Sequence, residues 1–454
     1  MNTSLYIGMQ ALEATQGALN ATSNNIANSN TPGYTREIPQ FTENVSSTTA
    51  GQVTGGGVNL NSLQSVRDEL LNLQINQQTS AQSGVDTQSS SLQQVETFFS
   101  TSGNDIGSAF ASFSTSLQGL SANSANAAAQ QGVISSGQSL AGAFNNTANG
   151  LASVQSAADL QVTQTVGQIN SLTKQIAQLN GQVHALTSAG KDGGTVEDQR
   201  DQLVQQLSKL TSVSISQSSD GEVITTGNGS PLVIGGQSLN LQTTTGTNGF
   251  QEVLDSQGND ITPSIQGGQL GGAIQVRDQV VPGYLTQLNT LATQFATAFN
   301  TAQGQGFDSN GNTGQAFFTV PATGAAAGLS VAITNPSLIA VSSDGSVGSN
   351  GNVANLSATL TTALPSGQTA AQSYSNLVFQ VGNDTSNASA ESSGIGQNLL
   401  QLTNQQSSVS GVSIDEETTN LIRYQTAYEA AARIISTVQQ LNTVTLNMGS
   451  SGGY

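Results

Sequence analysis

The stretch NNIANSNTPGY, residues 24–34, decides how this chain begins to fold. Asparagine tolerates the left-handed backbone and hydrogen-bonds to neighbouring peptide groups, so a cluster of asparagines predicts the end of a helix and a turn. Pro32 cannot continue a helix, and Pro32-Gly33 favours a tight turn with a positive φ at Gly33. Apolar residues are few and spaced here, which is poor material for a catalytic pocket. We therefore predict a hydrogen-bonded joint between helices, formed by Asn24, Asn25, Asn28, Pro32, Gly33 and Tyr34.

The composition argues against several classes of protein. The 454 residues carry a formal net charge of −18 and only nine lysines and arginines, which are scattered singly. Binding to a phosphate backbone requires clustered cations, so we expect no nucleic-acid partner. The chain has no cysteine and one histidine, which excludes thiol catalysis, cysteine-ligated metals and histidine-rich metal sites. We expect no enzyme, and hence no catalytic residues, no cofactor and no metal site.

The sequence also lacks the marks of a membrane protein. The first basic residue is Arg36, so the start of the chain has no charged segment of the kind that opens a secretory signal. No run approaches the length of about 20 apolar residues that spans a bilayer, and we expect no membrane partner. The uncharged polar composition and the missing cysteines favour an extracellular protein that is exported by another route.

The first segment of the chain predicts a helix over residues 3–24. Its apolar residues recur every seven positions, the spacing of a coiled-coil seam. A single helix of this length is marginally stable in water and needs a partner. The seam residues are Leu5, Leu12, Leu19 and Ile26.

The other end of the chain predicts the partner, a helix over residues 414–447. Ser413 and Glu416 form a capping-box pattern, and Asp415, Glu416 and Glu417 occupy the first turn, where the helix dipole favours negative charge. A second heptad series runs along this helix. We expect the two terminal helices to pair as a coiled coil through Ile414, Leu421, Tyr424, Tyr428, Ile435 and Val438.

The middle of the chain predicts a mainly α fold with a β insertion. Residues 35–62 are expected to be extended or loop. Helices are predicted at 63–100, 104–130, 147–188, 195–210, 274–303, 352–364 and 369–408, and a small antiparallel β subdomain at 211–265. The predicted domains are a terminal coiled-coil assembly domain (1–60 and 406–454) and a central helical domain (61–210 and 266–405) that carries the β subdomain. An outer domain is either small, within 304–350, or absent.

Three segments carry a resemblance to a known family. LEATQGALNATSNNIANSNTPGYTRE (12–37) resembles the N-terminal signature of the bacterial flagellar rod, hook and hook-associated proteins. The segments at 267–300 and 410–448, together with Thr35-Arg36 and the IDEE start of the last helix, are similar to the hook–filament junction members of that family. The resemblance is specific at these segments and weak elsewhere.

The resemblance implies a structural protein that is exported unfolded through the flagellar type III channel. It implies a ring of copies between the hook protein and the second hook–filament junction protein, with terminal helices forming an inner tube. An export chaperone at the C-terminal helix is also implied. The residues predicted above for the joint and the two heptad seams then form the assembly interface, within one subunit and between neighbours.

Two alternatives remain open at this point. One is a hook- or rod-type axial subunit of the same family, and Thr35-Arg36 and Ile414–Glu417 argue against it. The other is a secreted binding module built around the β subdomain.

Overall fold

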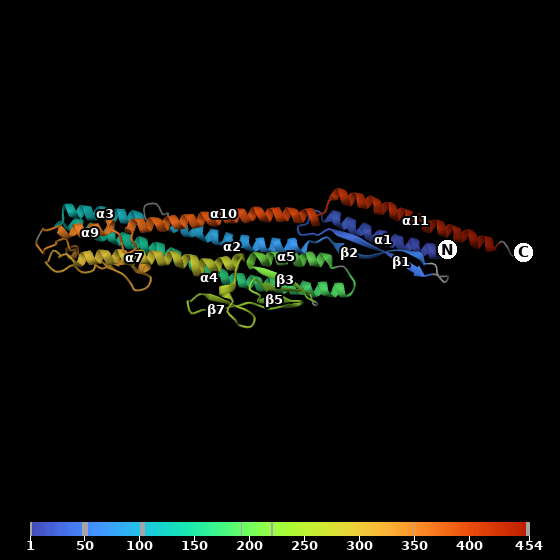
Figure 1. Ribbon diagram of the computed structural model, residues 1–454, viewed down its shortest axis with the longest axis horizontal. Helices are drawn as coiled ribbons and strands as arrows, with labels where there is room; N and C mark the ends of the chain where they lie inside the picture. Colours follow the sequence, from blue (N-terminus) through green and yellow to red (C-terminus); the bar gives the residue numbers. More distant parts are fainter. Residues whose placement is uncertain are drawn as a thin grey trace.

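The computed structural model describes residues 2–47, 53–99, 105–191, 193–218, 221–346 and 348–450. These residues form a long, narrow molecule that is mainly helical, as the sequence predicts (Figure 1). Both chain ends lie at the same end of the molecule. The terminal unit there consists of α1 (Asn2–Ala27), α11 (Ile414–Ser450) and a hairpin of β1 (Glu37–Ser47) and β2 (Val53–Ser65).

Helix α1 lies between α11 and the hairpin. Gly8 faces Ile435, whereas Asn25 at the other end of α1 contacts Glu417, so α1 and α11 are antiparallel. The buried apolar side chains of α1 are small ones, those of Ala14, Ala18 and Ala21. Small side chains allow the helix to approach two neighbours closely. The sequence analysis overlooked these alanines because it weighted large apolar residues.

The hairpin is more regular than the extended or loop conformation predicted for 35–62. Strands β1 and β2 pair antiparallel from Glu37↔Ser65 to Ser47↔Val53, with two register shifts. The predicted helix at 63–100 is wrong in its first residues, because residues 63–65 belong to β2. Helix α2 begins at Glu69.

The central part consists of long helices that run along the molecule (Figure 1). They are α2 (Glu69–Phe99), α3 (Ile106–Ala122), α4 (Ala127–Ser188), α5 (Gly194–Leu210), α6 (Gly268–Gln275), α7 (Val281–Gly304), α9 (Gly351–Thr361) and α10 (Ala370–Ser410).

Helix α4 corrects the prediction of separate helices at 104–130 and 147–188. The chain breaks after α3, and Asn126 caps α4 by accepting a hydrogen bond from the N–H of Ala128. The helix then continues without interruption through residues 131–146. This stretch is rich in glycine and serine, which are weak helix formers. Tertiary packing decides the outcome: a Cβ at Gly137 would lie 2.7 Å from the ring of Phe317, so glycine is the residue that lets this ring pack against the helix.

The far end of the molecule has an aromatic core. Phe113 packs against Phe295, Phe299, Phe317 and Phe318, with ring centroids 5.2–6.3 Å apart. Part of the segment 304–350 belongs to this core and contributes β9 (Phe318–Thr319), α8 (Ala325–Gly328) and β10 (Ser330–Val331).

A second core lies nearer the terminal unit, where a small β unit packs on α4 and α5. Its four-stranded antiparallel sheet has the order β3-β4-β5-β6, and β7 and β8 form a separate hairpin. The bounds are β3 (Val213–Ser218), β4 (Gly221–Thr226), β5 (Pro231–Ile234), β6 (Gln237–Ser238), β7 (Gln242–Thr245) and β8 (Gln251–Leu254).

The helix predicted at 274–303 begins earlier and contains a π-helical segment, Val276–Val280, between α6 and α7. Pro282 lies two residues after this segment and cannot donate a backbone hydrogen bond, which disrupts the regular α-helical pattern before it. The segment carries Arg277, which is fully buried. Its guanidinium bonds to Asp159 of α4, to Asp278 and to the carbonyl of Gln251 on β8. Arg277 thus ties the β unit to the long helix.

Candidate functional site

Asn25, near the end of α1, is the centre of the predicted joint. Its side chain is buried and makes four hydrogen bonds. Nδ2 donates to the carbonyl of Glu37 (2.9 Å) and to the carboxylate of Glu417 (3.1 Å). Oδ1 accepts from the N–H of Glu37 (3.0 Å) and from the hydroxyl of Tyr34 (2.8 Å). One amide therefore joins α1, the following loop, β1 and the start of α11.

The neighbouring asparagines have a local role. The side chain of Asn28 donates to the carbonyl and to Oδ1 of Asn24, and Thr31 donates to Oδ1 of Asn28. These bonds satisfy polar groups where α1 ends. Gly33 has φ = 76°, as the Pro-Gly pair predicts, and a Cβ there would clash with the side chain of Gln202. The positive φ favours glycine here, and a larger residue would also have to displace the Gln202 side chain.

The loop after α1 docks onto α5 of the central part. Gln202 donates to the carbonyl of Pro32 (2.8 Å), and the N–H of Thr35 donates to Asp198 (2.9 Å). Burial raises the pKa of the Asp198 carboxyl, although the hydrogen bonds from Thr35 and the guanidinium of Arg67 act in the opposite direction. The terminal unit and the central part therefore meet at a partly buried polar surface.

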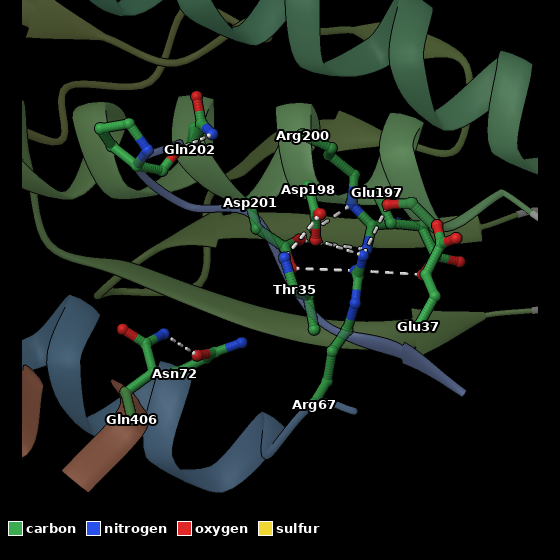
Figure 2. A network of polar contacts seen from close by, with 12 residues as sticks. Thr35, Glu37, Arg67, Asn72, Glu197, Asp198, Arg200, Asp201, Gln202 and Gln406 are labelled. Carbon is green, nitrogen blue, oxygen red and sulfur yellow. Dashed lines mark hydrogen bonds and ion pairs between the residues drawn. The ribbon is translucent and has the colours of Figure 1, made fainter. Parts of the chain in front are cut away.

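Arg67, two residues after β2, reinforces this contact (Figure 2). Its guanidinium forms ion pairs with Glu197 (3.0 Å), Asp198 (2.7 Å) and Asp201 (3.1 Å) of α5. Arg200 beside them pairs with Glu222 of β4 (2.8 Å). Because these carboxylates are engaged by arginines, the arrangement is suited to holding segments together and not to acid–base chemistry.

The corner between α10 and α11 closes the joint. The N–H of Arg36 donates to the carbonyl of Ser410, and its guanidinium pairs with Glu416 (2.6 Å). Ser413 accepts from the N–H of Glu416, so the capping serine acts as its pattern predicts. The sequence analysis assigned Glu416 and Glu417 only to the capping and the dipole of their own helix. Their contacts with Arg36 and Asn25 were missed, because the partners lie almost a full chain length away.

The residues predicted to form the two heptad seams are buried to different extents. Tyr424 and Val438 are buried, and Ile414 is exposed. The half-buried members are Leu5, Leu12, Leu19, Ile26, Leu421, Tyr428 and Ile435. Of the joint residues, Asn25 is buried, Asn28 and Tyr34 are half-buried, and Asn24, Pro32 and Gly33 are exposed.

The terminal unit exposes many large apolar side chains. Most of the exposed large hydrophobic residues of the described chain lie on its four elements and not on the larger central part. They are Tyr6, Met9, Ile38, Phe41, Val45, Ile414, Ile422, Ile434, Leu441, Val444, Leu446 and Met448. Concentrated exposure of this kind marks a surface for protein–protein contact.

The described residues lack two further kinds of feature. No group of three or more histidine, aspartate or glutamate residues has a geometry that could hold a metal ion. Among the helices that the structure describes, none is both long and apolar enough to cross a bilayer.

Comparison with protein families gives three matches. The model of the flagellar hook-associated protein FlgK helical domain matches residues 92–318, half of the chain. Models of the flagella basal body rod protein and of the flagellar basal body rod FlgEFG protein C-terminal region match residues 5–35 and 404–448. The two outer matches cover the joint and the terminal helices.

Individual relatives agree. Flagellar hook-associated protein 1 of Bacillus subtilis (strain 168) is 30% identical over 507 aligned residues, which cover 99% of this chain and 100% of that protein. The chain belongs to the flagellar hook-associated protein 1 family. The namesake of Escherichia coli (strain K12) is 27% identical, with the same coverage of both chains. The family resemblance predicted from the end motifs is thus confirmed.

The fold agrees with the flagellar hook-associated protein 1 family. The flagellar hook junction protein FlgK from Burkholderia pseudomallei superposes with a TM-score of 0.68 at 19% identity, covering 74% of this chain and 100% of that one. The family consists of structural flagellar proteins and not of enzymes, so this chain is a structural component of the flagellum.

Proposed function

We propose that this protein is an adaptor subunit between the flagellar hook and filament, and that it assembles through its terminal unit. The observation that carries the proposal is the concentration of exposed apolar side chains on α1, α11 and the hairpin. The relatives point the same way, since they are named for the hook and one is described as a hook junction protein.

In this proposal, each domain predicted from the sequence has its own role. Residues 1–60 and 406–454 form the assembly domain. The central helical domain (61–210 and 266–405), the β subdomain (211–265) and the segment 304–350 face outward. The proposed interface consists of Leu5, Leu12, Leu19 and Ile26 of α1 and of Ile414, Leu421, Tyr424, Tyr428, Ile435 and Val438 of α11.

The joint has a specific task in this proposal. The loop after α1 attaches the assembly domain to the central domain, because Pro32 and Thr35 hydrogen-bond to Gln202 and Asp198 of α5. Asn25 holds this loop in place within the assembly domain through buried polar contacts. Such contacts are directional and costly to break, because they leave desolvated polar groups behind. They therefore set the angle at which the central domain leaves the assembly domain.

The proposed partners are further copies of this chain, the flagellar hook protein and the second hook–filament junction protein. We further propose that the chain is exported by the flagellar type III system to an extracellular position. An export chaperone engages the C-terminal helix before export.

The test uses purified protein, isolated hooks and cells. Leu421 lies on the face of α11 that also carries the buried Tyr424 and Ala431, so Leu421→Asp places a charge in the α1–α11 contact. We expect this variant to lose hook binding and to leave cells without filaments. Ser436→Asp is the matched control, because Ser436 is exposed on another face of α11. Normal filaments with Leu421→Asp would contradict the proposal.

A further inference from the structure

Helix α11 carries two apolar stripes, and α1 covers one of them. The covered stripe has heptad spacing, and three of its members, Tyr424, Ala431 and Val438, are at most 8% exposed. It consists of Leu421, Tyr424, Tyr428, Ala431, Ile435 and Val438.

The second stripe has the same alternating spacing of three and four residues. It is displaced from the first by one residue, which is about 100° around an α-helix. All six of its members are exposed, and Ile434, Leu441 and Val444 are exposed by 49%, 54% and 50%. The stripe consists of Ala427, Ala430, Ile434, Thr437, Leu441 and Val444. A helix with two such seams can pack against two helices at once.

The outer face of α1 offers a complementary stripe. Tyr6 and Met9 are 53% and 57% exposed, and Glu13 continues the heptad spacing. Within the described chain, neither Glu13 nor Arg433, which flanks the second stripe of α11, forms an ion pair. Glu429, one turn before Arg433 on the same flank, is exposed as well. The two surfaces thus combine apolar residues with charged ones, and Glu13 of one can meet Arg433 of the other.

The register of the terminal helices brings these surfaces within reach of a neighbouring copy. Because Gly8 faces Ile435 and the helices are antiparallel, the first residue of α1 comes level with about Leu441. The last residues of α11 extend about 13 Å beyond this point, at 1.5 Å per residue (Figure 1). A second α1, shifted along the axis, can cover this extension.

We propose that the second stripe of α11 packs against the outer stripe of α1 in a second copy of this chain. This inference rests on the proposed assembly function and names the surfaces that carry it. The contact joins two different faces, so it is head-to-tail and repeats from copy to copy. Contacts of this kind generate rings or helical arrays, whereas a contact between two identical faces stops at a dimer.

The test exploits the absence of cysteine from the chain. Met9→Cys and Leu441→Cys proteins are mixed, incubated with isolated hooks and oxidised, and the products are separated without reductant. A disulfide requires Cα atoms within about 7 Å, so it reports direct packing. We expect a cross-linked dimer from the mixture, little from either variant alone, and a ladder from the double variant. Ser436→Cys replaces Leu441→Cys in the control and should give no product.

A charge exchange provides the second measurement. Arg433→Glu and Glu13→Arg should each reduce the amount of protein bound to hooks, and the double variant should restore it. If the double variant does not restore binding, the proposed pairing is wrong. It is also wrong if Leu441→Cys alone gives cross-linked dimers, because these would indicate contact between two α11 helices. Hook-bound protein that gives no Met9–Leu441 cross-link would also overturn the pairing while leaving the proposed function intact. Wild-type protein that does not bind hooks would instead count against the proposed function.

Discussion

Replacement of Asn25 by alanine tests whether one buried amide holds the two ends of the chain together. The change removes three hydrogen bonds to neutral groups and one to the carboxylate of Glu417, which is 3% exposed. A neutral bond contributes about 1 kcal/mol and a bond to a charged group about 1.5–3 kcal/mol. Water can enter the space that the amide leaves, so we expect a net loss of about 3–5 kcal/mol.

Hydrogen exchange of the backbone amides measures this loss locally. The opening free energy of α1 and of the hairpin should fall, and their exchange should accelerate by about a hundredfold or more, since 1.4 kcal/mol is a factor of ten. The aromatic core around Phe113 serves as an internal reference and should exchange at an unchanged rate.

Asn28→Ala is the matched control for this experiment. The side-chain amide of Asn28 bonds only to the exposed Asn24 and Thr31 nearby in the sequence, so its loss should cost about 0.5 kcal/mol. If Asn25→Ala accelerates exchange in α1 no more than Asn28→Ala does, the joint does not depend on this amide and the reasoning fails.

Three further predictions address the backbone of the joint, the buried arginine and a titrating tyrosine. Gly33→Ala should lower the thermal unfolding temperature by more than Gly229→Ala does, because both positions have a positive φ but only a Cβ at Gly33 also meets a neighbouring side chain. An equal decrease in the two variants would show that the contact with Gln202 does not matter. Arg277→Met should lower the free energy of unfolding in urea by about 1–3 kcal/mol, because it removes the hydrogen bonds of the buried guanidinium to Asp159, Asp278 and the carbonyl of Gln251. The exposed Arg433→Met should change it by less than about 0.5 kcal/mol. Burial and the nearby Asp105 raise the pKa of Tyr374 to about 12, so the hydroxyl keeps its proton to a higher pH in the folded state than in the unfolded state. The stability that this group contributes should be complete below pH 10 and decline as the pH rises toward 12. Tyr374→Phe should remove this decline when the free energy of unfolding is measured as a function of pH.

Local chemistry made much of this fold predictable. Heptad spacing located both terminal helices, and the Pro-Gly pair anticipated the positive φ of Gly33, because these signals depend on neighbours in the sequence. The capping serine at 413 was identifiable for the same reason. The β unit was recognisable from the change of period after residue 210.

Element boundaries failed where distant residues decide them. The segment 131–146 is weakly helical by composition, and it becomes helical because rings such as that of Phe317 pack against α4. The hairpin β1–β2 was read as extended or loop, because its strands are stabilised by each other and by α1 and carry only a weak pattern of their own.

The joint combines, within a single motif, features that neighbouring residues determine and features that distant residues determine. The sequence by itself determined that a cluster of asparagines ends the first helix, since asparagine side chains bond to adjacent peptide groups whatever the rest of the chain does. Only the tertiary structure decided that Asn25 is the buried one and that its partner is Glu417, 392 residues away. The physical reason is that a hydrogen bond becomes costly to lose only when its groups are removed from water. That removal depends on which helices and strands surround the site, and hence on the whole fold.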